Sequence, residues 1–584
     1  EKYLIDELKK ISYKKNTTIA IITKTNRDLE RILHRCEVES IPVSSERSID
    51  IFSHPAGALF FDLIEFIYDP TKFDLLAKTL ISGLWGLSFD NSVELIKSLK
   101  AGKNIELEKK LPILKIIQRE FTEDGPLNFI IHLAELTGFQ NIIAREPSYM
   151  EVWRGIVTLA ESIFRESNIQ NPRELLNRLV AYKYSAETRS VKISVGTPDL
   201  PIRVMTAHAS KGLEFDYVFI PYATEESWVG RNWGNYFVLP EIRTINDIKD
   251  IRRLFYVAIT RARIHAVILF GEKNYSQSLT PLRFIGELNT NYITHTSLNK
   301  KEEKKAIITA VTKSNSHAKK CIDYAKSILQ ESGLSVTALN HFIKCPSEFL
   351  YQSILKLPQP LAPLAEKGNA MHKAIDTVWK SKDISVKSIE NILKSTIENY
   401  FYDSLIPSFE KEGIKKELFD DISVIAKELE YHFAQKGTIF SETWSETVFG
   451  GIVLHGKLDA IIDNEKEVFV FDYKTKQVMS ENEIRGGTKN SDGNYFRQLV
   501  FYKLLLQDDS RFFDKEIIPS LVFIIPDSKG RCPTITLPIE KSDIEKLKTE
   551  IQSLIDSVNS GALMTTFCDD AKCEWCRLKR VSLS

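Results

Sequence analysis

The sequence predicts a multidomain α/β and α+β protein, in which an α/β domain is interrupted by an all-α insertion and followed by an α+β domain. A chain of 584 residues is too long for a single compact domain. Domains commonly hold about 150 residues, so we expect about four of them. Strand-like apolar runs occur over 17–43 and return between 191 and 270, whereas residues 52–187 carry apolar positions three and four apart. Beyond residue 331, helical patterns flank a group of alternating strands.

Composition narrows the class of protein. With 43% hydrophobic and 10% aromatic residues, the chain can bury large cores and is neither low-complexity nor wholly disordered. Lys plus Arg and Asp plus Glu both number 78, so the zero net charge favours no particular partner, and nucleic acid would be bound through local patches. No apolar run approaches the roughly 18 residues that span a bilayer, and no leader pattern opens the sequence. We therefore expect no membrane contact and a cytoplasmic location.

The element pattern sets the expected domain bounds. Residues 17–43 predict a buried strand, a turn at Thr25 and Asn26, an amphipathic helix and a short strand. Further strands are expected at 191–195, 202–205, 217–221 and 266–270, with a helix over 251–260. We assign 1–50 and 188–298 to the interrupted α/β domain, 51–187 to the helical insertion, the lysine-rich 299–330 to a linker and 331–584 to the α+β domain. In that last domain, helices are expected over 335–355, 364–380, 385–403, 414–435, 494–507 and 540–558, and strands within 446–474 and 519–525.

Two strings in the α/β domain combine a polar loop with an arginine-rich helix. HASKGLEF at 208–215 lies between two apolar strands, and ligands bind at such strand ends in α/β sheets. RRLFYVAITRAR at 252–263 predicts a helix whose arginines, taken alone, fit an ordinary solvated face. Together the strings resemble the motifs that close the second RecA-like lobe of superfamily I helicases of the UvrD, Rep, RecB and AddA kind, and ITKTN at 22–26 resembles the motif that opens it. The resemblance covers about residues 15–290, with the insertion matching a regulatory subdomain.

The resemblance implies a nucleotide site in this lobe. Gly212 and Glu214 would face the nucleotide, and Arg261 would reach the γ-phosphate as an arginine finger. Lys24 would also belong to the nucleotide site, although it stands where the family usually has Arg and offers a point charge without bidentate geometry.

The same resemblance implies DNA contacts and a missing half of the motor. Thr206 and His208 would contact the DNA backbone, which positions DNA without reading its sequence. No G-x-x-x-x-G-K-[ST] loop occurs in the sequence, although that loop cradles the phosphates and presents the hydroxyl that binds Mg²⁺. We therefore expect ATP to act only together with the missing first lobe, and no ATP hydrolysis by this chain alone. A fragment of a longer helicase and a naturally short subunit both fit this pattern.

A hairpin predicted over 446–476 brings two carboxylates together. If Asn464 pairs with Glu467, Asp459 lies almost opposite Asp472 at a Cβ spacing of roughly 5 Å. Two carboxylates so close repel unless a cation lies between them, and hard oxygen ligands select Mg²⁺ or Mn²⁺. Lys474, two residues after Asp472, shares its face of the strand. The spacing alone fits equally a solvent-facing hairpin with an ordinary Asp–Lys salt bridge.

The wider pattern resembles a nuclease family. GKLDAIID at 456–463 and VFDYKTK at 470–476, followed by Gln498 and Tyr502 on one helix face, closely resemble the PD-(D/E)xK nuclease domain of RecB and AddB, which has a restriction-endonuclease-like fold. GNAMHKAID at 368–376 supplies the upstream histidine of that family. The resemblance implies Lys474 as the catalytic lysine, with Gln498 and Tyr502 as supporting contacts to the site or to DNA. The metal ligands that it implies are His372, Asp459, Asp472 and the backbone carbonyl of Tyr473.

The cysteine pattern suggests a metal or a cluster. Seven cysteines are too few for a disulfide scaffold, yet three crowd near the C-terminus. SVTALNHFIKCPSEFLY at 335–351 resembles the segment that donates the first thiolate of a [4Fe–4S] cluster in AddB-like nucleases, whose tail is C-x₂-C-x₅-C. The tail here departs from that spacing, because Ser582 stands at the third position, and Cys568 would supply the missing thiolate from the other side; the expected ligand set is therefore Cys345, Cys568, Cys573 and Cys576. A Cys₄ zinc site, or a degenerate cluster with buried or free cysteines, also fits.

The leading hypothesis from the sequence is the C-terminal portion of an ATP-dependent helicase–nuclease that unwinds and degrades DNA ends in double-strand break repair. Its expected partners are double-stranded DNA ends, single strands and, as an option, a second helicase–nuclease subunit. One alternative is a DNA-binding scaffold or partner subunit with an inactive motor half. Another keeps the helicase lobe and treats the nuclease fold as a DNA-binding platform, which the presence of Asp459, Asp472 and Lys474 disfavours.

Overall fold

The structure is a computed structural model in which the chain forms two compact units, Glu1–Ser314 with Cys568–Ser584, and Asn315–Phe567. We describe each unit by itself. The residues that it describes are 2–11, 17–39, 41–101, 105–145, 147–166, 169–185, 190–195, 200–229, 248–271, 273–274, 277–296, 316–360, 362–381, 385–404, 406–488, 491–568, 570 and 573–583. None of the described helices is long and apolar enough to cross a bilayer.

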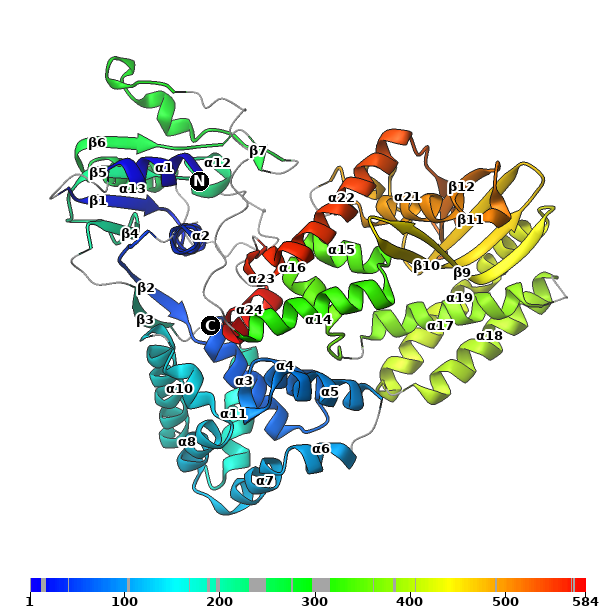
Figure 1. The fold of residues 1–584 in the computed structure, drawn as a ribbon, viewed down its shortest axis with the longest axis horizontal. Helices are drawn as coiled ribbons and strands as arrows, with labels where there is room; N and C mark the ends of the chain where they lie inside the picture. The colour runs from blue at the N-terminus through cyan, green and yellow to red at the C-terminus, as the bar shows by residue number, and fades with distance from the viewer. Residues whose placement is uncertain are drawn as a thin grey trace, which may run out of the picture. The chain divides into compact units, whose positions relative to one another are not determined.

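The first unit contains a parallel four-stranded sheet in the order β4-β1-β5-β6 (Figure 1). Its strands are β1 (Ile19–Thr23), β4 (Ile202–Thr206), β5 (Phe215–Ile220) and β6 (Ala262–Ile268). Because successive strand residues point to opposite faces, Ile19 and Ile21 pack with α1 (Lys2–Ile11) and α2 (Asn26–Val38), whereas Ala20 and Ile22 pack with α12 (Glu225–Trp228) and α13 (Ile248–Ile259). Short elements follow the sheet: β7 (Lys273–Asn274), β8 (Gln277–Ser278), η2 (Arg283–Glu287) and η3 (Thr290–Tyr292).

Strand β6 begins four residues before the predicted start at residue 266. It lies at the edge of the sheet, and its residues 263–266 are exposed. An exposed edge strand needs no continuous apolar run, so hydrophobicity alone located only the half-buried end of β6.

A helical insertion lies in the chain between β2 (Ser45–Asp50) and β3 (Ser190–Val195), which pair antiparallel. The described insertion is helical throughout, as its period of three and four residues predicts. Its elements are α3 (Pro55–Tyr68), α4 (Phe73–Ile81), η1 (Leu84–Gly86), α5 (Phe89–Lys100), α6 (Ile105–Lys110), α7 (Ile113–Glu123), α8 (Pro126–Leu136), α9 (Phe139–Ile143), α10 (Pro147–Glu166) and α11 (Pro172–Tyr184).

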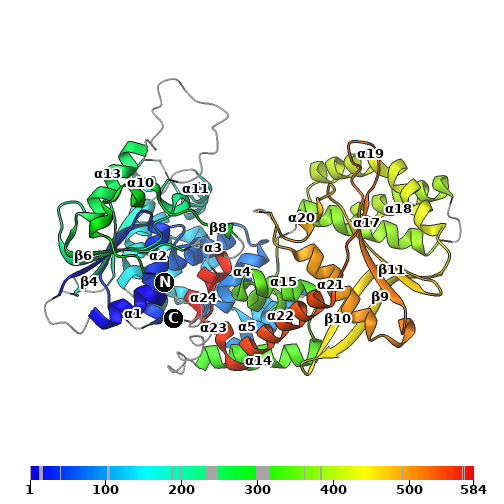
Figure 2. The ribbon, with the colours of Figure 1, turned by 90° about the horizontal axis from the view of Figure 1, so that it is seen from above.

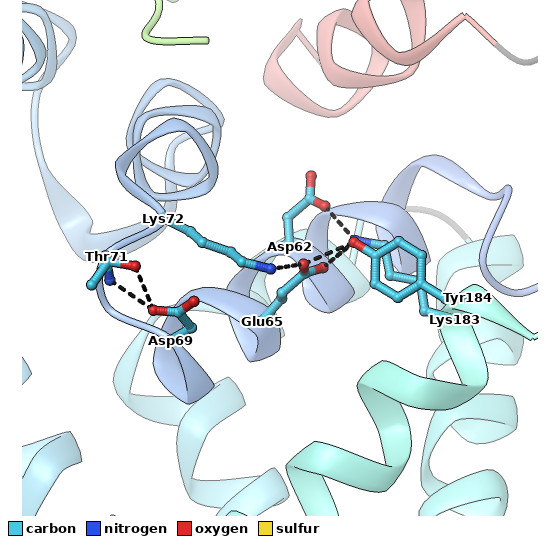
Figure 3. Close-up of polar contacts among 7 residues, drawn as sticks. All are labelled: Asp62, Glu65, Asp69, Thr71, Lys72, Lys183 and Tyr184. Carbon is cyan, nitrogen blue, oxygen red and sulfur yellow. Dashed lines mark hydrogen bonds and ion pairs between the residues drawn. The ribbon is translucent and has the colours of Figure 1, made fainter. Parts of the chain in front are cut away.

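An ionic cluster around the buried Glu65 joins α3, the first helix of the insertion, to α11, the last (Figure 3). The Glu65 carboxylate is 2% exposed and lies 2.8 Å from the Lys183 ammonium and 2.5 Å from that of Lys72. The Tyr184 hydroxyl donates to both Glu65 oxygens, and Lys183 also contacts Asp62 at 3.0 Å. The cluster thus fastens the helices through which the chain enters and leaves the insertion.

The C-terminal helix α24 (Glu574–Leu583) packs against the insertion within the first unit. Glu574 pairs with Lys78 at 2.9 Å, and Arg145 donates to the carbonyl of Val581 at 2.8 Å. Residues 568–584, which the sequence assigns with 331–567, therefore cluster with the first unit. The predicted domain bounds otherwise stay a prediction.

The second unit begins with α14 (Ser316–Ser332). This helix occupies the second half of the segment 299–330, which the sequence assigns to a linker. The first part of that segment, up to residue 315, lies outside the described residues. Figures 1 and 2 show its sheet covered by helices on both faces. Its other helical elements are α15 (Val336–Lys344), α16 (Pro346–Glu348), η5 (Phe349–Ile354), α17 (Pro363–Trp379), α18 (Val386–Asp403), α19 (Ser408–Phe433), α20 (Glu481–Ile484), α21 (Asn494–Gln507), η6 (Ser510–Phe512), α22 (Lys541–Ser560) and α23 (Ala562–Thr565).

The second unit's sheet has the order β13-β12-β11-β10-β9. Its strands are β9 (Thr438–Phe449), β10 (Ile452–Asp463), β11 (Glu467–Lys474), β12 (Glu516–Phe523) and β13 (Thr534–Thr536); β11 and β12 run parallel, and the other neighbours antiparallel. One core joins α17–α19 to the side chains of Ala460, Ile462, Phe471 and Tyr473. The opposite core joins α21 to β12 through Leu499, Leu521 and Phe523.

Candidate active site

The hairpin of β10 and β11 has the predicted register. Asn464 N–H donates to the carbonyl of Glu467 at 3.0 Å, and Ala460 pairs with Phe471. Because the register continues along the two strands, Asp459 and Asp472 lie directly beyond the pair of Ala460 and Phe471. The Asn464 side chain accepts the N–H of Glu467 at 2.7 Å, which closes the turn locally and sets this register.

Helix α21 supplies the polar partners of Asp472. Gln498 Nε2 donates to Asp472 Oδ1 at 2.9 Å, and the Tyr502 hydroxyl donates to the same oxygen at 3.1 Å. Gln498 Oε1 accepts from Lys474 Nζ at 2.8 Å. Because residues four apart lie on one helix face, Gln498 and Tyr502 reach the site together, as the sequence predicts. Gln498 therefore bridges the carboxylate and the lysine.

Asp472 is a buried charge, 3% exposed, on β11. Its Oδ2 lies 2.5 Å from Lys474 Nζ but accepts no well-aligned hydrogen bond. Burial raises the pKa of the Asp472 carboxyl, and the charge of Asp459 adds to this, while Lys474 and His372 oppose it. Burial would lower the pKa of Lys474, yet the charge of Asp472 and their contact raise it on balance.

His372 of α17 contacts the second aspartate. Its Nδ1 lies 3.2 Å from Asp459 Oδ2, and the backbone N–H of Tyr473 donates to the same oxygen at 2.9 Å. Burial would lower the pKa of His372, but the hydrogen bond to Asp459 and the charges of Asp459 and Asp472 outweigh it, so the pKa is raised. The structure thus brings together His372, Asp459, Asp472, Lys474, Gln498 and Tyr502.

Tyr473 anchors the strand from the other face, as alternation along β11 predicts. Its hydroxyl accepts from Trp379 Nε1 at 3.2 Å and lies 3.5 Å from His432 Nδ1. The His432 ring stacks on Phe471 with centroids 4.3 Å apart. These contacts hold the backbone segment whose N–H orients Asp459.

The donor types of this site suit a divalent metal ion, although the ligand atoms of His372, Asp459 and Asp472 do not all lie within 4.8 Å of one another. The buried Asp472 Oδ2 lacks an aligned hydrogen bond, and a second carboxylate, Asp459, adjoins it. Carboxylate oxygens with one imidazole suit Mg²⁺ or Mn²⁺. The residues that can hold the ion are His372, Asp459 and Asp472, with the Tyr473 carbonyl as the further ligand that the family resemblance implies.

One residue beside the site was missed by sequence reasoning. The Tyr495 ring centroid lies 5.0 Å from Lys474 Nζ and 5.0 Å from Lys476 Nζ. Tyr495 is three positions before Gln498, so the helical period that selects Gln498 and Tyr502 also selects it. An aromatic residue on a helix face is usually core, and the sequence carried no sign that it meets two lysines.

The helicase-like loop and the arginine of the first unit also come together. Arg261 Nη1 donates to the carbonyl of Leu213 at 3.1 Å, so this guanidinium adjoins the loop that carries Gly212 and Glu214. Gly212 has φ +86°, a left-handed backbone conformation that favours glycine. The preference comes from the backbone alone, because a Cβ at this position would meet no atom within 4 Å. Glu214 is exposed.

The remaining predicted residues of this lobe lie at strand ends or in loops. Thr206 ends β4 opposite Thr23, and its hydroxyl accepts from the N–H of Ala209 at 3.4 Å. His208 is exposed in the following loop. Lys24 donates to the backbone carbonyl of Trp228, and burial lowers its pKa. Its ammonium is thus engaged by its own lobe, and its role toward nucleotide stays a prediction.

No disulfide joins any of the seven cysteines, all of which are described. Cys568 Sγ lies 3.5 Å from Cys576 Sγ, and the N–H of Cys568 donates to the same sulfur at 3.4 Å. Cys573 directly precedes α24. Cys345 is buried between α15 and α16 of the second unit, so its membership of one set with the C-terminal cysteines stays a prediction from the resemblance.

Two protein-family models match the chain. Residues 131–273 match the UvrD-like helicase C-terminal domain, and residues 333–581 match the PD-(D/E)XK nuclease superfamily. This chain joins a UvrD-like helicase C-terminal domain to a PD-(D/E)XK nuclease domain. The two matches agree with the motif resemblances and with the parallel and mixed sheets of the two units. These two parts of the chain are thus similar to the corresponding domains of UvrD-like and RecB-like proteins.

Three curated relatives of the chain are each longer than it is. ATP-dependent DNA helicase Rep of Buchnera aphidicola (subsp. Schizaphis graminum) is 30% identical over 235 residues, 37% of this chain and 33% of Rep. The RecBCD enzyme subunit RecB of Chlamydia pneumoniae is 22% identical over 492 residues, 78% of this chain and 42% of RecB. DNA helicase IV of Escherichia coli is 34% identical over 120 residues, 19% of this chain and 17% of that helicase. The chain therefore spans less than half the length of each.

Proposed function

We propose that this chain cleaves DNA phosphodiester bonds with Mg²⁺ or Mn²⁺ and contributes half of the ATP site of a motor that unwinds DNA ends in double-strand break repair. The main observation in support of the nuclease activity is that Gln498 bridges Asp472 and Lys474 by hydrogen bonds. The likeness to RecB along 78% of the chain supports the same assignment.

The residues of the nuclease site divide the work. A metal ion held by the aspartates would supply an activated water and a Lewis acid for the phosphate. The Lys474 ammonium would stabilise the charge that develops on the phosphate oxygens, and Gln498 would keep that ammonium beside Asp472. His372 would help to orient Asp459, because its ring contacts the oxygen that also accepts the Tyr473 N–H.

The experiment is a cleavage assay on labelled linear duplex and single-stranded DNA with Mg²⁺, Mn²⁺ or EDTA. We expect cleavage by the wild type that EDTA abolishes and that Asp472→Ala and Lys474→Ala lose. Lys548→Ala is the matched control, because Lys548 pairs with the exposed Glu545 on α22. Undiminished cleavage by both site variants would refute the site, and DNA binding by a wild type that never cleaves would favour the scaffold alternative.

The motor half is proposed from Gly212, Glu214 and Arg261, which share one corner of the lobe. Thr206 and His208 would contact DNA phosphates from the neighbouring loop. We expect no ATP hydrolysis by this chain alone, because no phosphate-cradling loop occurs in its sequence. DNA-stimulated ATP hydrolysis by the purified chain would contradict this.

Two further proposals concern the cluster and the partner. We propose a [4Fe–4S] cluster on Cys345, Cys568, Cys573 and Cys576, since four thiolates are its usual ligands. We also propose that a second subunit takes part, because the RecB relative is itself named as a subunit of the RecBCD enzyme. The cytoplasmic location expected from the sequence stays a prediction.

A further inference from the structure

Tyr495 places an aromatic ring against the lysine of the nuclease site. Its ring centroid lies 5.0 Å from Lys474 Nζ, while the same ammonium lies 2.5 Å from Asp472 Oδ2 and donates to Gln498 Oε1 at 2.8 Å. The Lys474 side chain is 16% exposed, so water takes little part in holding it. Its ammonium therefore has three partners, namely a carboxylate, an amide oxygen and a ring.

The ring attracts cations independently of Asp472. Lys476 Nζ also lies 5.0 Å from the Tyr495 centroid, although the two ammonium groups repel each other. An aromatic face carries the negative side of a quadrupole, which attracts ammonium groups within about 6 Å. Two lysines at this distance identify the ring as a site for cations.

The backbone at the start of α21 places Tyr495 beside Lys474. Gly493, with φ +70°, is the N-cap of α21, and Tyr495 follows in the first turn. A Cβ on Gly486 would lie 2.8 Å from the backbone nitrogen of Gly493, so the preceding loop approaches too closely for a side chain there. Tyr495, Gln498 and Tyr502 then lie on one face of α21, three and four residues apart.

A divalent cation on Asp472 would change how strongly each of the three partners holds the Lys474 ammonium. The carboxylate charge is then shared, so the ion pair that holds the ammonium at 2.5 Å weakens. The ring accepts no conventional hydrogen bond, so it attracts the ammonium while leaving N–H groups available for phosphate oxygens. Gln498 takes one of these N–H groups.

We propose that Tyr495 is a positioning residue of the nuclease site, whose ring keeps the Lys474 ammonium in place when Asp472 binds metal. This rests on the proposed nuclease function. The ring face carries the effect, so Tyr495→Phe retains it and Tyr495→Leu loses it. The hydroxyl is dispensable for it.

The test varies the ring's electrons at constant shape. In the full chain, residue 495 is replaced by phenylalanine and by mono-, di- and trifluorinated phenylalanine, because each fluorine weakens the quadrupole with little change in volume. We expect kcat for cleavage of linear DNA to fall stepwise to a total loss of about 3- to 30-fold, with KM nearly constant. Phe496→Leu is the matched control, because the Phe496 ring lies 4.2 Å from the Arg485 guanidinium, a similar contact that involves none of the proposed site residues.

A second readout needs no cleavage. With Ca²⁺ present, the labelling of Lys474 by an amine-reactive ester is measured by mass spectrometry, with Lys548 as the internal reference. We expect labelling of Lys474 to rise severalfold from the phenylalanine to the trifluorinated protein. Flat kcat and flat labelling across the series would overturn the role of Tyr495. Active Asp472→Ala and Lys474→Ala variants would overturn the nuclease function instead, and the labelling series would still decide the role of Tyr495.

Discussion

The Lys474 ammonium lies 2.5 Å from Asp472 Oδ2, so two residues of one strand neutralise each other inside the second unit. Lys474→Met removes the cation and leaves a buried carboxylate without its counter-charge. We expect a loss of stability of about 3–5 kcal/mol, as is usual when one partner of a buried ion pair is removed. Thermal unfolding should show a lower midpoint, which Mg²⁺ or Mn²⁺ raises more in the variant than in the wild type.

Lys548→Met serves as the control for that measurement, because its partner Glu545 is largely exposed. Its midpoint should stay near that of the wild type with and without metal. Equal metal-induced shifts in Lys474→Met and wild type would contradict a metal at Asp472.

Gln498 and Tyr502 both donate to Asp472 Oδ1, but they should not be equivalent. Gln498→Leu removes the bridge to Lys474 as well, and we expect kcat for DNA cleavage to fall about 10- to 100-fold. Tyr502→Phe leaves the amide donor in place and should cost about tenfold or less. Steady-state cleavage of labelled linear DNA measures both; a larger loss in Tyr502→Phe would mean that the bridge is unimportant.

The buried Glu65 should dominate the stability of the helical insertion (Figure 3). Glu65→Ala leaves Lys183 paired with Asp62 alone and removes the charge-assisted hydrogen bonds from Lys72 and Lys183, so it should cost about 2–3 kcal/mol. Tyr184→Phe removes only a hydroxyl donor and should cost about 0.5–1.5 kcal/mol. Hydrogen exchange in α3 and α11 monitors the unfolding of the first unit and measures the loss of stability in each variant. Equal losses in Glu65→Ala and Tyr184→Phe would contradict the ion pairs as the cause.

The same carboxyl predicts acid sensitivity. Burial would raise the pKa of Glu65, but hydrogen bonds from Lys183 and Lys72 and the Lys183 charge lower it below its ordinary 4.5. A lowered folded pKa contributes stability that is complete above pH 4.5 and is lost as pH falls through the folded value. The thermal midpoint of the wild type should therefore fall more steeply below pH 4.5 than that of Glu65→Gln. Parallel pH profiles for the two proteins would exclude this carboxyl as the cause.

The C-terminal cysteines should bind iron. Protein purified without oxygen should contain iron and acid-labile sulfide, and Cys573→Ala and Cys576→Ala should lose both. Cys36→Ala is the control, because burial raises the pKa of the Cys36 thiol to about 12 and keeps it protonated. Zinc without sulfide would instead support the Cys₄ zinc alternative, and a metal-free wild type would remove both.

Short-range chemistry explains what sequence reasoning predicted well. The side chain of Asn464 closes its own turn, so the register that places Asp459 beside Asp472 follows from neighbouring residues. The helical period likewise placed Gln498 and Tyr502 on one face of α21. By contrast, β6 was predicted to start too late, because an exposed edge strand lacks the apolar run that marks a buried one.

The sequence by itself determined the domain families, the alternation of β11 and the residues that carry the proposed chemistry, because motifs, turns and periods depend on nearby residues. Only the tertiary structure decided which side chains meet. Packing of α21 against the sheet brings Tyr495 to Lys474, packing of α17 brings His372 to Asp459, and packing of α24 places the C-terminal segment on the insertion. The physical reason is that burial and ion pairing act between surfaces far apart in the chain, and their geometry exists only once the cores have formed.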